Sequence, residues 1–370
     1  MQNEPTRRDV LMAGAIVVGG AAAGACEMGM KPKTGGKEEP DSAAALRELL
    51  AVNRTKHPKY AGGLANHLSM ELIALQRLGA SADRLREFAC TYGKALDPFP
   101  SGGPEIDASD WSAAIGRSDA VASLASFFEA DIARRGREEA LRSALDKLWP
   151  LVGSQAFHCM IRTAYGVDAG DDAEIAHGLA YWVADADSLG QLSQPAERAS
   201  DVGELIERIR ADGDLVGERI SGGSIRRRML TAAQRPGFAE VASSLEVADH
   251  TLDDIALAML GLYVSTRDFT ALHAVTGTHA LRLLLPFARE REVALRYQWQ
   301  ALAAAFIALG APRIDASFPT DAPDWAAVVE RTLPSDDDHD AKFVYSCRCE
   351  EGVRGGTLYR LAAARRVEVG

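Results

Sequence analysis

The sequence predicts an all-α fold, a single large helical domain with a buried histidine-rich centre. Apolar residues recur every three or four positions through most of the chain beyond residue 41, which is the pattern of amphipathic helices. No sustained alternation of apolar and polar residues indicates a strand, and no Asn-Gly pair indicates a tight hairpin. Several histidines fall within the apolar stretches, where their side chains would face the core.

The composition suits one large domain or two ordinary ones. Of the 370 residues, 47% are hydrophobic and 25% are charged, which is ordinary for a globular protein. The net charge of −11 argues against nucleic acid as the main partner, and the aromatic share of 6% leaves little for stacking bases. Five irregularly spaced cysteines indicate neither a disulfide framework nor a zinc site.

The first residues are expected to be an export signal. Arg7 and Arg8 precede a short apolar stretch rich in glycine and alanine, which resembles a twin-arginine signal; two chance arginines before an ordinary secretory signal are the alternative. The stretch ends in a lipobox-like sequence at Cys26, but Ala23 stands where lipoproteins usually have leucine, so a lipid anchor stays open. We expect residues 1–26 to be the signal peptide, 27–41 a flexible tether and 42–370 the helical domain of an exported, periplasmic or lipid-anchored protein.

Periodicity places most helices one after another. It predicts helices over residues 42–52, 66–79, 81–96, 119–136, 137–149, 172–186, 251–265 and 291–309. Ser81 and Thr251 suit N-cap positions. Gly79, Gly190 and Gly310 suit helix ends. Residues 213–245 are less regular and are expected to form a mobile segment over the core.

The stretch that begins at Ser335 predicts a helix that turns a histidine and a lysine inward. Ser335 can be its N-cap, and Asp336–Asp338 would lie in the first turn, where negative charge is favourable. At about 100° per residue, His339, Lys342 and Phe343 share one sector, which the phenylalanine marks as facing the core. An inward lysine can pair with a buried carboxylate, or it can lose its charge. A neutral amine can add CO₂ to form a carbamate, an anionic ligand beside His339.

Two further histidines are candidate metal ligands on separate helices. His67 shares a helix face with Glu71, whose carboxylate could fix the imidazole tautomer; a packed core histidine is the alternative. His158 has apolar neighbours and Arg162 one turn later. For His158, too, a packed polar residue is the alternative.

His273 and His279 are six residues apart, so an unbroken helix could not aim both at one atom unless Gly277 bends it. We expect at least one of the two to be a ligand. His57 and His250 are expected in polar loops.

Histidines without cysteine ligands suit iron, zinc, copper or nickel inside a helical bundle. The chain lacks His-Glu-x-x-His and the paired Glu-x-x-His motifs of di-iron carboxylate proteins. It also lacks Gly-x-Ser-x-Gly, Gly-x-Gly-x-x-Gly and a P-loop. Hydrolase, flavin and nucleotide functions therefore have no support from motifs.

Several blocks of the sequence, in their order, resemble the questin oxidase-like family. The blocks are GGLANHLSMELIALQRLGAS, GSQAFHCMIRTAYGVD, AHGLAYW, LHAVTGTHALRLLLP and DDHDAKFVY, and the resemblance covers most of residues 58–365. Known members open an anthraquinone ring oxidatively, in a Baeyer–Villiger-like sense, and have been linked to a histidine-rich non-haem iron centre. The resemblance implies metal-site roles for His67, His158, His273, His279, His339 and Lys342. The expected export of this chain distinguishes it from the known fungal members, so their polyketide substrates cannot be assigned to it directly. His177 is interpreted as structural.

The resemblance, together with the candidate histidines, implies an oxidoreductase of the monooxygenase or dioxygenase type. It would use molecular oxygen and non-haem iron to cleave a ring or C–C bond of a phenolic or quinone molecule, with NADPH open as electron donor. Arg162 is the candidate catalytic residue and would stabilise a developing oxyanion; a salt bridge is its alternative. A non-catalytic exported binding protein and a structural zinc protein are the competing interpretations, and metal content distinguishes them.

Overall fold

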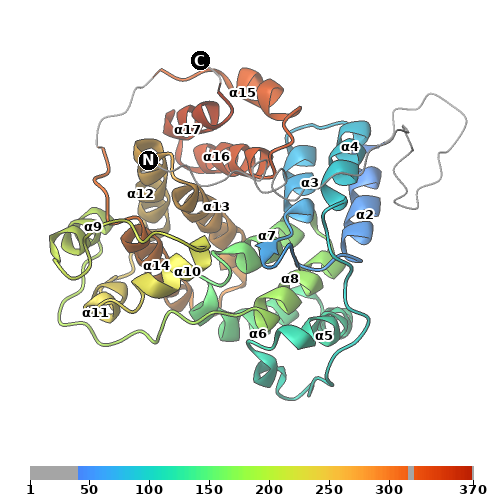
Figure 1. Cartoon of the computed structure of the whole chain (residues 1–370), viewed down its shortest axis with the longest axis horizontal. Helices are drawn as coiled ribbons and strands as arrows, with labels where there is room; N and C mark the ends of the chain where they lie inside the picture. Colours follow the sequence, from blue (N-terminus) through green and yellow to red (C-terminus); the bar gives the residue numbers. More distant parts are fainter. Residues whose placement is uncertain (1–40, 316–320, 369–370) are drawn as a thin grey trace, which may run out of the picture.

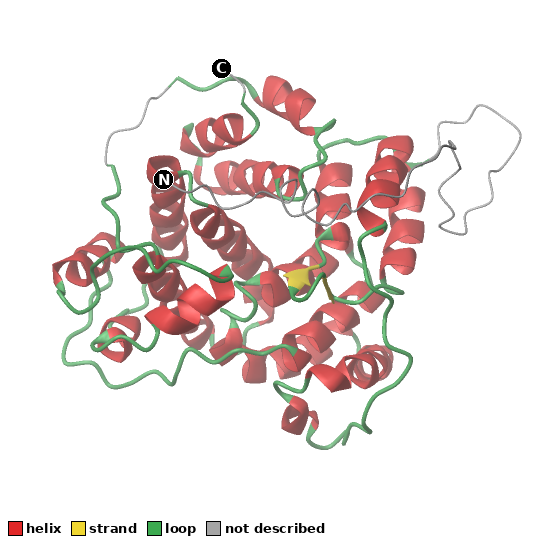
Figure 2. Ribbon diagram, viewed as in Figure 1, coloured by secondary structure: helices red, strands yellow, loops and turns green. Residues whose placement is uncertain are grey.

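The computed structural model describes residues 41–315 and 321–368 (Figure 1). These ranges are mainly helical, as Figure 2 shows, so the predicted all-α fold is confirmed. The sheet found among them is one antiparallel pair of two-residue strands, β1 (Lys59–Tyr60) and β2 (Leu64–Ala65). No helix in the same ranges is long and apolar enough to cross a membrane. The predicted signal peptide and all but the last residue of the predicted tether lie outside the described residues.

The helices follow one another along the chain, and some of the connections are long, such as the one from Ala184 to Val202. The first half contains α2 (Ser42–Asn53), α3 (Leu68–Arg77), α4 (Ala82–Gly93), α5 (Val121–Arg135), α6 (Arg137–Leu148), α7 (His158–Ala169) and α8 (Asp172–Ala184). The second half contains α9 (Val202–Ala211), α10 (Ile225–Ala232), α11 (Phe238–Ser243), α12 (Thr251–Thr266), α13 (Phe269–Leu284), α14 (Arg291–Ala308), α15 (Trp325–Thr332), α16 (Asp340–Arg354) and α17 (Leu358–Arg366). Short 3₁₀ turns lie at Trp111–Ala114, Ser118–Ala120, Trp149–Leu151 and Leu285–Phe287.

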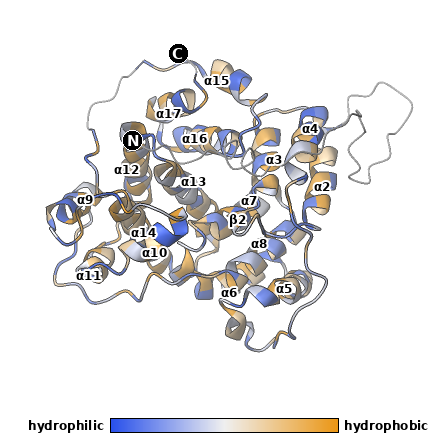
Figure 3. Ribbon diagram, viewed as in Figure 1, coloured by the Kyte–Doolittle hydropathy of each residue, from blue (hydrophilic) through white to orange (hydrophobic). Residues whose placement is uncertain are grey.

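Four helices that are far apart in the sequence pack in a closed ring. α3 packs on α7, α7 on α13, α13 on α16, and α16 back on α3. α14 packs behind α13, and nearly all of its residues from Ala294 to Ala308 are buried, so it is apolar on most sides. Outer helices such as α5 and α15 carry both hydrophilic and hydrophobic residues in Figure 3, as helices with one buried face do.

Local capping signals account for some helix boundaries. The Ser81 hydroxyl accepts a hydrogen bond from the Arg84 N–H at 3.2 Å, so the predicted N-cap of α4 is confirmed. The predicted N-cap of α12 is wrong, because His250 holds that position and the Thr251 hydroxyl accepts from the backbone before it. Gly79 and Gly310 directly follow the C-caps of α3 and α14, as expected, with φ of +98° and +84°, a region that glycine adopts without strain. The expectation for Gly190 is wrong, because α8 already ends at Ala184. Residues 213–245, expected to be irregular, contain α10 and α11.

α16 begins four residues later than the sequence predicts. Residues 335–339 are turns and irregular backbone, and His339 rather than Ser335 is the N-cap. The Glu71 carboxylate on α3 accepts hydrogen bonds from the N–H groups of the helix's second and third residues, at 2.9 and 3.2 Å. The start of α16 is therefore fixed by a buried contact with a helix about 270 residues earlier in the chain.

α13 is not bent at Gly277. It runs unbroken from Phe269 to Leu284. The glycine instead makes room for a neighbouring side chain, because a Cβ at this position would lie 2.9 Å from Cγ of Phe157. His273 and His279 therefore point in different directions from one regular helix.

The turn before α7 is strained and holds His158 at the helix start. Gln155, Ala156 and Phe157 have φ of +50°, +55° and +71°. Each left-handed non-glycine residue costs about 1–2 kcal/mol, so the surroundings must stabilise this turn. The Gln155 N–H donates to the buried Asp187 carboxylate at 3.1 Å, and Phe157 is fully buried against α13.

Replacing Gly277 by alanine is expected to lower the free energy of unfolding by about 1–3 kcal/mol, because the new methyl group would overlap Phe157. Urea denaturation measures the change. Gly352→Ala is the matched control, since Gly352 is also helical and an added Cβ meets no atom within 4 Å there. Equal stability of the two variants would contradict the close packing of α13 on the left-handed turn.

Candidate metal centre

The ring of helices brings together four histidines that are far apart in the sequence. His67 is the N-cap of α3, His158 is the first residue of α7, His339 is the N-cap of α16, and His273 lies in the second turn of α13. The ring of His67 lies 4.6 Å from that of His158 and 4.5 Å from that of His339, measured between centroids. The rings of His158 and His273 are 4.7 Å apart. We call these four residues the histidine cluster.

Three ring nitrogens of the cluster lie close enough together that they could hold one metal ion. One nitrogen from each of His67, His158 and His339 lies within 4.8 Å of the other two. The Nε2 atom of His273 is 3.1 Å from Nε2 of His158, so the fourth imidazole reaches the same space. Metal–imidazole bonds of about 2.1 Å would require only small adjustments of these side chains.

Two of the imidazoles are held by backbone carbonyls on their Nδ1 side. Nδ1 of His158 is 2.5 Å from the carbonyl oxygen of Gln155, and Nδ1 of His273 is 2.7 Å from that of Phe269. A carbonyl oxygen can only accept, so each Nδ1 carries the proton and each Nε2 keeps its lone pair. This is the tautomer that binds a metal through Nε2.

Asp338 orients the other two imidazoles. Its Oδ1 atom accepts from Nδ1 of His339 at 2.9 Å, and its Oδ2 atom lies 3.2 Å from Nδ1 of His67. Burial opposes ionisation of this carboxyl, but the two imidazoles hold the pKa of Asp338 well below its usual range. Nε2 of His339 is buried and has no hydrogen-bond partner among the described residues, so it is available to a ligand.

The role of Asp338 was not predicted from the sequence. Asp338 was expected in the solvated first turn of a helix starting at Ser335, but it precedes the helix and is 4% exposed. In a run of three aspartates, no local signal shows which one faces inward until the start of α16 is known. Glu71 does not pair with His67 but caps α16.

The cluster favours uncharged imidazoles. Burial holds the pKa of His67, His158 and His273 well below its usual value. Neutral imidazole is the form that binds metals, so these three side chains do not have to lose a proton first.

Lys342 lies in the same interior without an ionic partner. Its side chain is 4% exposed, and its Nζ atom makes neither a hydrogen bond nor an ion pair within 4 Å in the part of the chain that the structure describes. Burial lowers the pKa of Lys342, although Asp338 and Glu71 oppose the shift. Burial also raises the pKa of Glu71 to about 8, which weakens it as a counter-ion. Among the described residues, Lys342 therefore forms no salt bridge.

A comparison with protein families adds evidence that is independent of this geometry. The sequence model of the questin oxidase-like family matches residues 64–347. The chain belongs to the questin oxidase-like family. This family suggests an oxidoreductase, and the matched residues include the whole histidine cluster, Asp338 and Lys342. No curated protein matches the chain.

In this questin oxidase-like protein, Asp338→Asn is expected to weaken metal binding by about 10–100-fold, because a neutral amide lacks the negative charge that lies beside Nδ1 of both His339 and His67. Competition with a chelator of known affinity measures the change. Asp336→Asn is the control, since that exposed carboxylate pairs with Arg84 instead. Equal metal affinities of the two variants would contradict the orienting role of Asp338.

His279 lies outside the histidine cluster of the questin oxidase-like domain. Its Nδ1 atom is 2.9 Å from Oε1 of Glu350 on α16, and Arg282 binds the same carboxylate at 2.9 Å. At least one of His273 and His279 was expected to be a ligand. His273 is the one that lies in the histidine cluster.

Arg162 of the questin oxidase-like domain forms a buried ion pair. Its Nε atom donates to Oε1 of Glu174 on α8 at 2.8 Å, and neither side chain is more than 1% exposed. This contact is the salt-bridge alternative considered for Arg162, and it ties α7 to α8.

The remaining histidines of the questin oxidase-like domain have local contacts. His177 is buried near Glu129, His57 is half-buried against the Lys59 backbone, and His250 is exposed.

Phe269 connects the histidine cluster to the surface. It is the first residue of α13 and is 37% exposed. Its ring centroid lies 4.4 Å from that of His339 and 4.7 Å from that of His273. An aromatic ring in contact with both solvent and buried imidazoles offers a stacking surface at the edge of the cluster.

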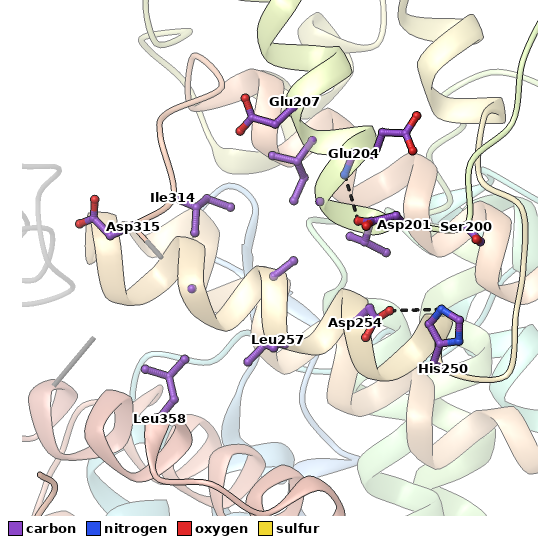
Figure 4. Close-up of a pocket in the computed structure, with 15 residues that line it drawn as sticks. Ser200, Asp201, Glu204, Glu207, His250, Asp254, Leu257, Ile314, Asp315 and Leu358 are labelled. Atoms are coloured by element: carbon purple, nitrogen blue, oxygen red, sulfur yellow. Dashed lines mark hydrogen bonds and ion pairs between the residues drawn. The ribbon is translucent and has the colours of Figure 1, made fainter. Parts of the chain in front are cut away.

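A separate hollow of the questin oxidase-like domain lies beside α9 and α12 (Figure 4). Acidic side chains surround it, but two of them have structural partners. Asp201 accepts from the N–H of Glu204 and caps α9, and Asp254 lies 3.6 Å from Nε2 of His250. No residue of the histidine cluster lines this hollow, so we do not place the reaction there.

Proposed function

We propose that this chain is an oxygen-dependent oxidoreductase that holds one non-haem iron in the histidine cluster. The observation that carries the proposal is the convergence of His67, His158 and His339, whose ring nitrogens lie within 4.8 Å of one another. Imidazole ligands suit iron among other transition metals, and the family match supports an oxidoreductase. The bound iron would supply the activation of oxygen. His273 is proposed as a fourth ligand, since its Nε2 atom faces that of His158.

Lys342 is proposed to supply an anionic ligand. Its amine nitrogen would attack the carbon of CO₂ and lose one proton, which leaves a carbamate with a negatively charged oxygen. Burial without an ionic partner supports an uncharged amine at this position. The carbamate would add negative charge to a set of neutral imidazoles.

The proposed substrate is a flat phenolic or quinone molecule that is cleaved at a ring or C–C bond next to a carbonyl. Phe269 supports this class, because its half-exposed ring can stack on an aromatic substrate beside His339 and His273. NADPH is proposed as an electron donor, and the assay is run with and without it.

The test begins with elemental analysis of the protein purified without chelator. Stoichiometric iron, together with ¹⁸O₂-dependent oxidation of a hydroxyanthraquinone that His158→Ala abolishes, is the expected result. Zinc with unfolding on chelation would instead indicate a structural zinc protein. A metal-free protein of normal stability would indicate a binding protein and overturn the proposal.

We also propose that residues 1–26 direct export by the twin-arginine machinery, with Cys26 as a site for a lipid anchor. Replacing Arg7 and Arg8 by lysines is expected to leave a full-length precursor in the cytoplasm, because the pattern depends on paired arginines. Cell fractionation with immunoblotting measures the precursor. Normal export of the lysine variant would point to the ordinary secretory route.

A further inference from the structure

A buried carboxylate connects the strained turn before α7 with α10. Asp187 lies in the loop that follows α8, and its side chain is 7% exposed. The strained turn, residues 155–157, leads directly into His158 at the start of α7. α10 supplies Arg226, its second residue, from a later part of the chain. One carboxylate therefore lies between a surface helix and the backbone that carries a proposed metal ligand.

The conformation of this turn makes its supports informative. A left-handed conformation is unfavourable for a residue with a side chain, and residues 155, 156 and 157 adopt it in succession. Strain of this kind persists only where the surroundings hold it in place, and it is common at functional sites. Because the next residue is His158, the turn determines where the backbone presents that imidazole.

Gln155 connects Asp187 to the imidazole. Its carbonyl oxygen is 2.5 Å from Nδ1 of His158, which holds the proton on Nδ1 and the lone pair on Nε2. Its N–H donates to Oδ2 of Asp187 at 3.1 Å, and its side-chain amide is 3.4 Å from the same oxygen. The orientation of the imidazole thus depends on the turn, and the turn is bonded to Asp187.

Arg226 and Ser154 hold Asp187 from two sides. Arg226 donates from Nε to Oδ2 at 2.7 Å and from Nη2 to Oδ1 at 2.5 Å, which is a bidentate ion pair. The Asp187 N–H donates to the Ser154 hydroxyl at 2.8 Å, and that hydroxyl donates to the carbonyl of Leu151 at 2.6 Å. Both carboxylate oxygens are therefore fixed in direction by a side chain of α10.

We propose, on the basis of the metal site proposed above, that Asp187 and Arg226 are positioning residues for that site. They hold the left-handed turn so that the Gln155 carbonyl aims Nε2 of His158 at the other imidazoles of the histidine cluster. Neither residue touches the metal. Their role does not depend on which metal is bound or which reaction follows.

The first test compares Co²⁺ binding by Asp187→Asn and Asp185→Asn in the purified full chain, by competition with a chelator of known affinity. Asp185 is the matched control, because its side chain is 5% exposed and also pairs with a cation, Lys59. Affinity is expected to fall about tenfold in Asp187→Asn and to stay unchanged in Asp185→Asn. Equal affinities of the two variants would overturn the positioning role.

The second test needs no metal, so it separates the positioning role from the proposed metal site. In protein labelled with [¹⁵N]histidine, the ring-nitrogen shifts of His158 are expected to show the Nδ1–H tautomer, with the signals assigned by their absence in His158→Ala. Arg226→Gln is expected to move these shifts toward the average of the two tautomers, whereas Asp185→Asn leaves them unchanged. The Arg226 side chain is 44% exposed, so this variant is expected to fold.

The two tests distinguish the possible failures. Unchanged His158 shifts in Arg226→Gln would overturn the positioning role, whatever the metal content. An unaltered protein that binds no Co²⁺, but whose His158 shifts respond as expected, would contradict the proposed metal site and leave the positioning of the imidazole supported.

Discussion

Replacing His158 by alanine is expected to abolish stoichiometric metal binding while the protein stays largely helical. His158 is central to the histidine cluster, since its ring stacks on that of His67 and its Nε2 atom is 3.1 Å from that of His273. Removal of the His158 imidazole takes away one ligand and also the contacts that align His67 and His273. The helices themselves are stabilised by an extensive apolar core, so they should persist. The same result is expected for His67→Ala.

Elemental analysis gives the metal content of these variants, and far-ultraviolet circular dichroism gives their helicity. His250→Ala is the control, because that side chain is 60% exposed at the start of α12. If His67→Ala and His158→Ala both kept full metal content, the metal would bind outside the histidine cluster.

Replacing Arg162 by alanine is expected to destabilise the protein by about 3–5 kcal/mol. The guanidinium and the Glu174 carboxylate are both almost completely buried, with a contact of 2.8 Å between Nε and Oε1. Truncation of the arginine leaves a buried carboxylate without compensation, which is far more costly than removing both charges. Urea denaturation measures the loss.

The double variant Arg162→Met, Glu174→Leu is the matched control for this prediction. It removes both charges and fills similar volume, so most of the lost stability should return. If the folded double variant also has the activity of the unaltered enzyme, Arg162 is structural. A stable Arg162→Ala variant that has lost activity would restore the catalytic interpretation and contradict the ion-pair argument.

Most of the fold could be predicted because helical periodicity is a local property. The helices over 42–52 and 291–309 are examples in which apolar spacing alone gave bounds close to those of α2 and α14. Apolar neighbours made the histidines of the cluster candidates, and the resemblance to the questin oxidase-like family favoured them as metal ligands.

The rest depends on contacts between distant segments. The start of α16 is set by Glu71 on α3, and the inward position of Asp338 follows from that start. His273 and His279 could not be separated without knowing that α13 stays straight. That Gly277 makes room for Phe157, which packs there from a left-handed turn in another part of the chain, likewise depends on the fold.

The closed ring of α3, α7, α13 and α16 has a consequence for how the chain unfolds. An ion bound to His158 and His273 would join two points that are 115 residues apart along the chain, as a covalent cross-link does. Closing a loop of about 100 residues restricts the unfolded chain by about 4–5 kcal/mol in the chain-entropy treatment of cross-links. The free energy of metal binding therefore becomes part of the free energy of folding, and the midpoint of thermal unfolding should rise with free metal concentration. Loss of the ion would remove this cross-link and lower the midpoint of thermal unfolding, while the apolar core keeps the helices formed.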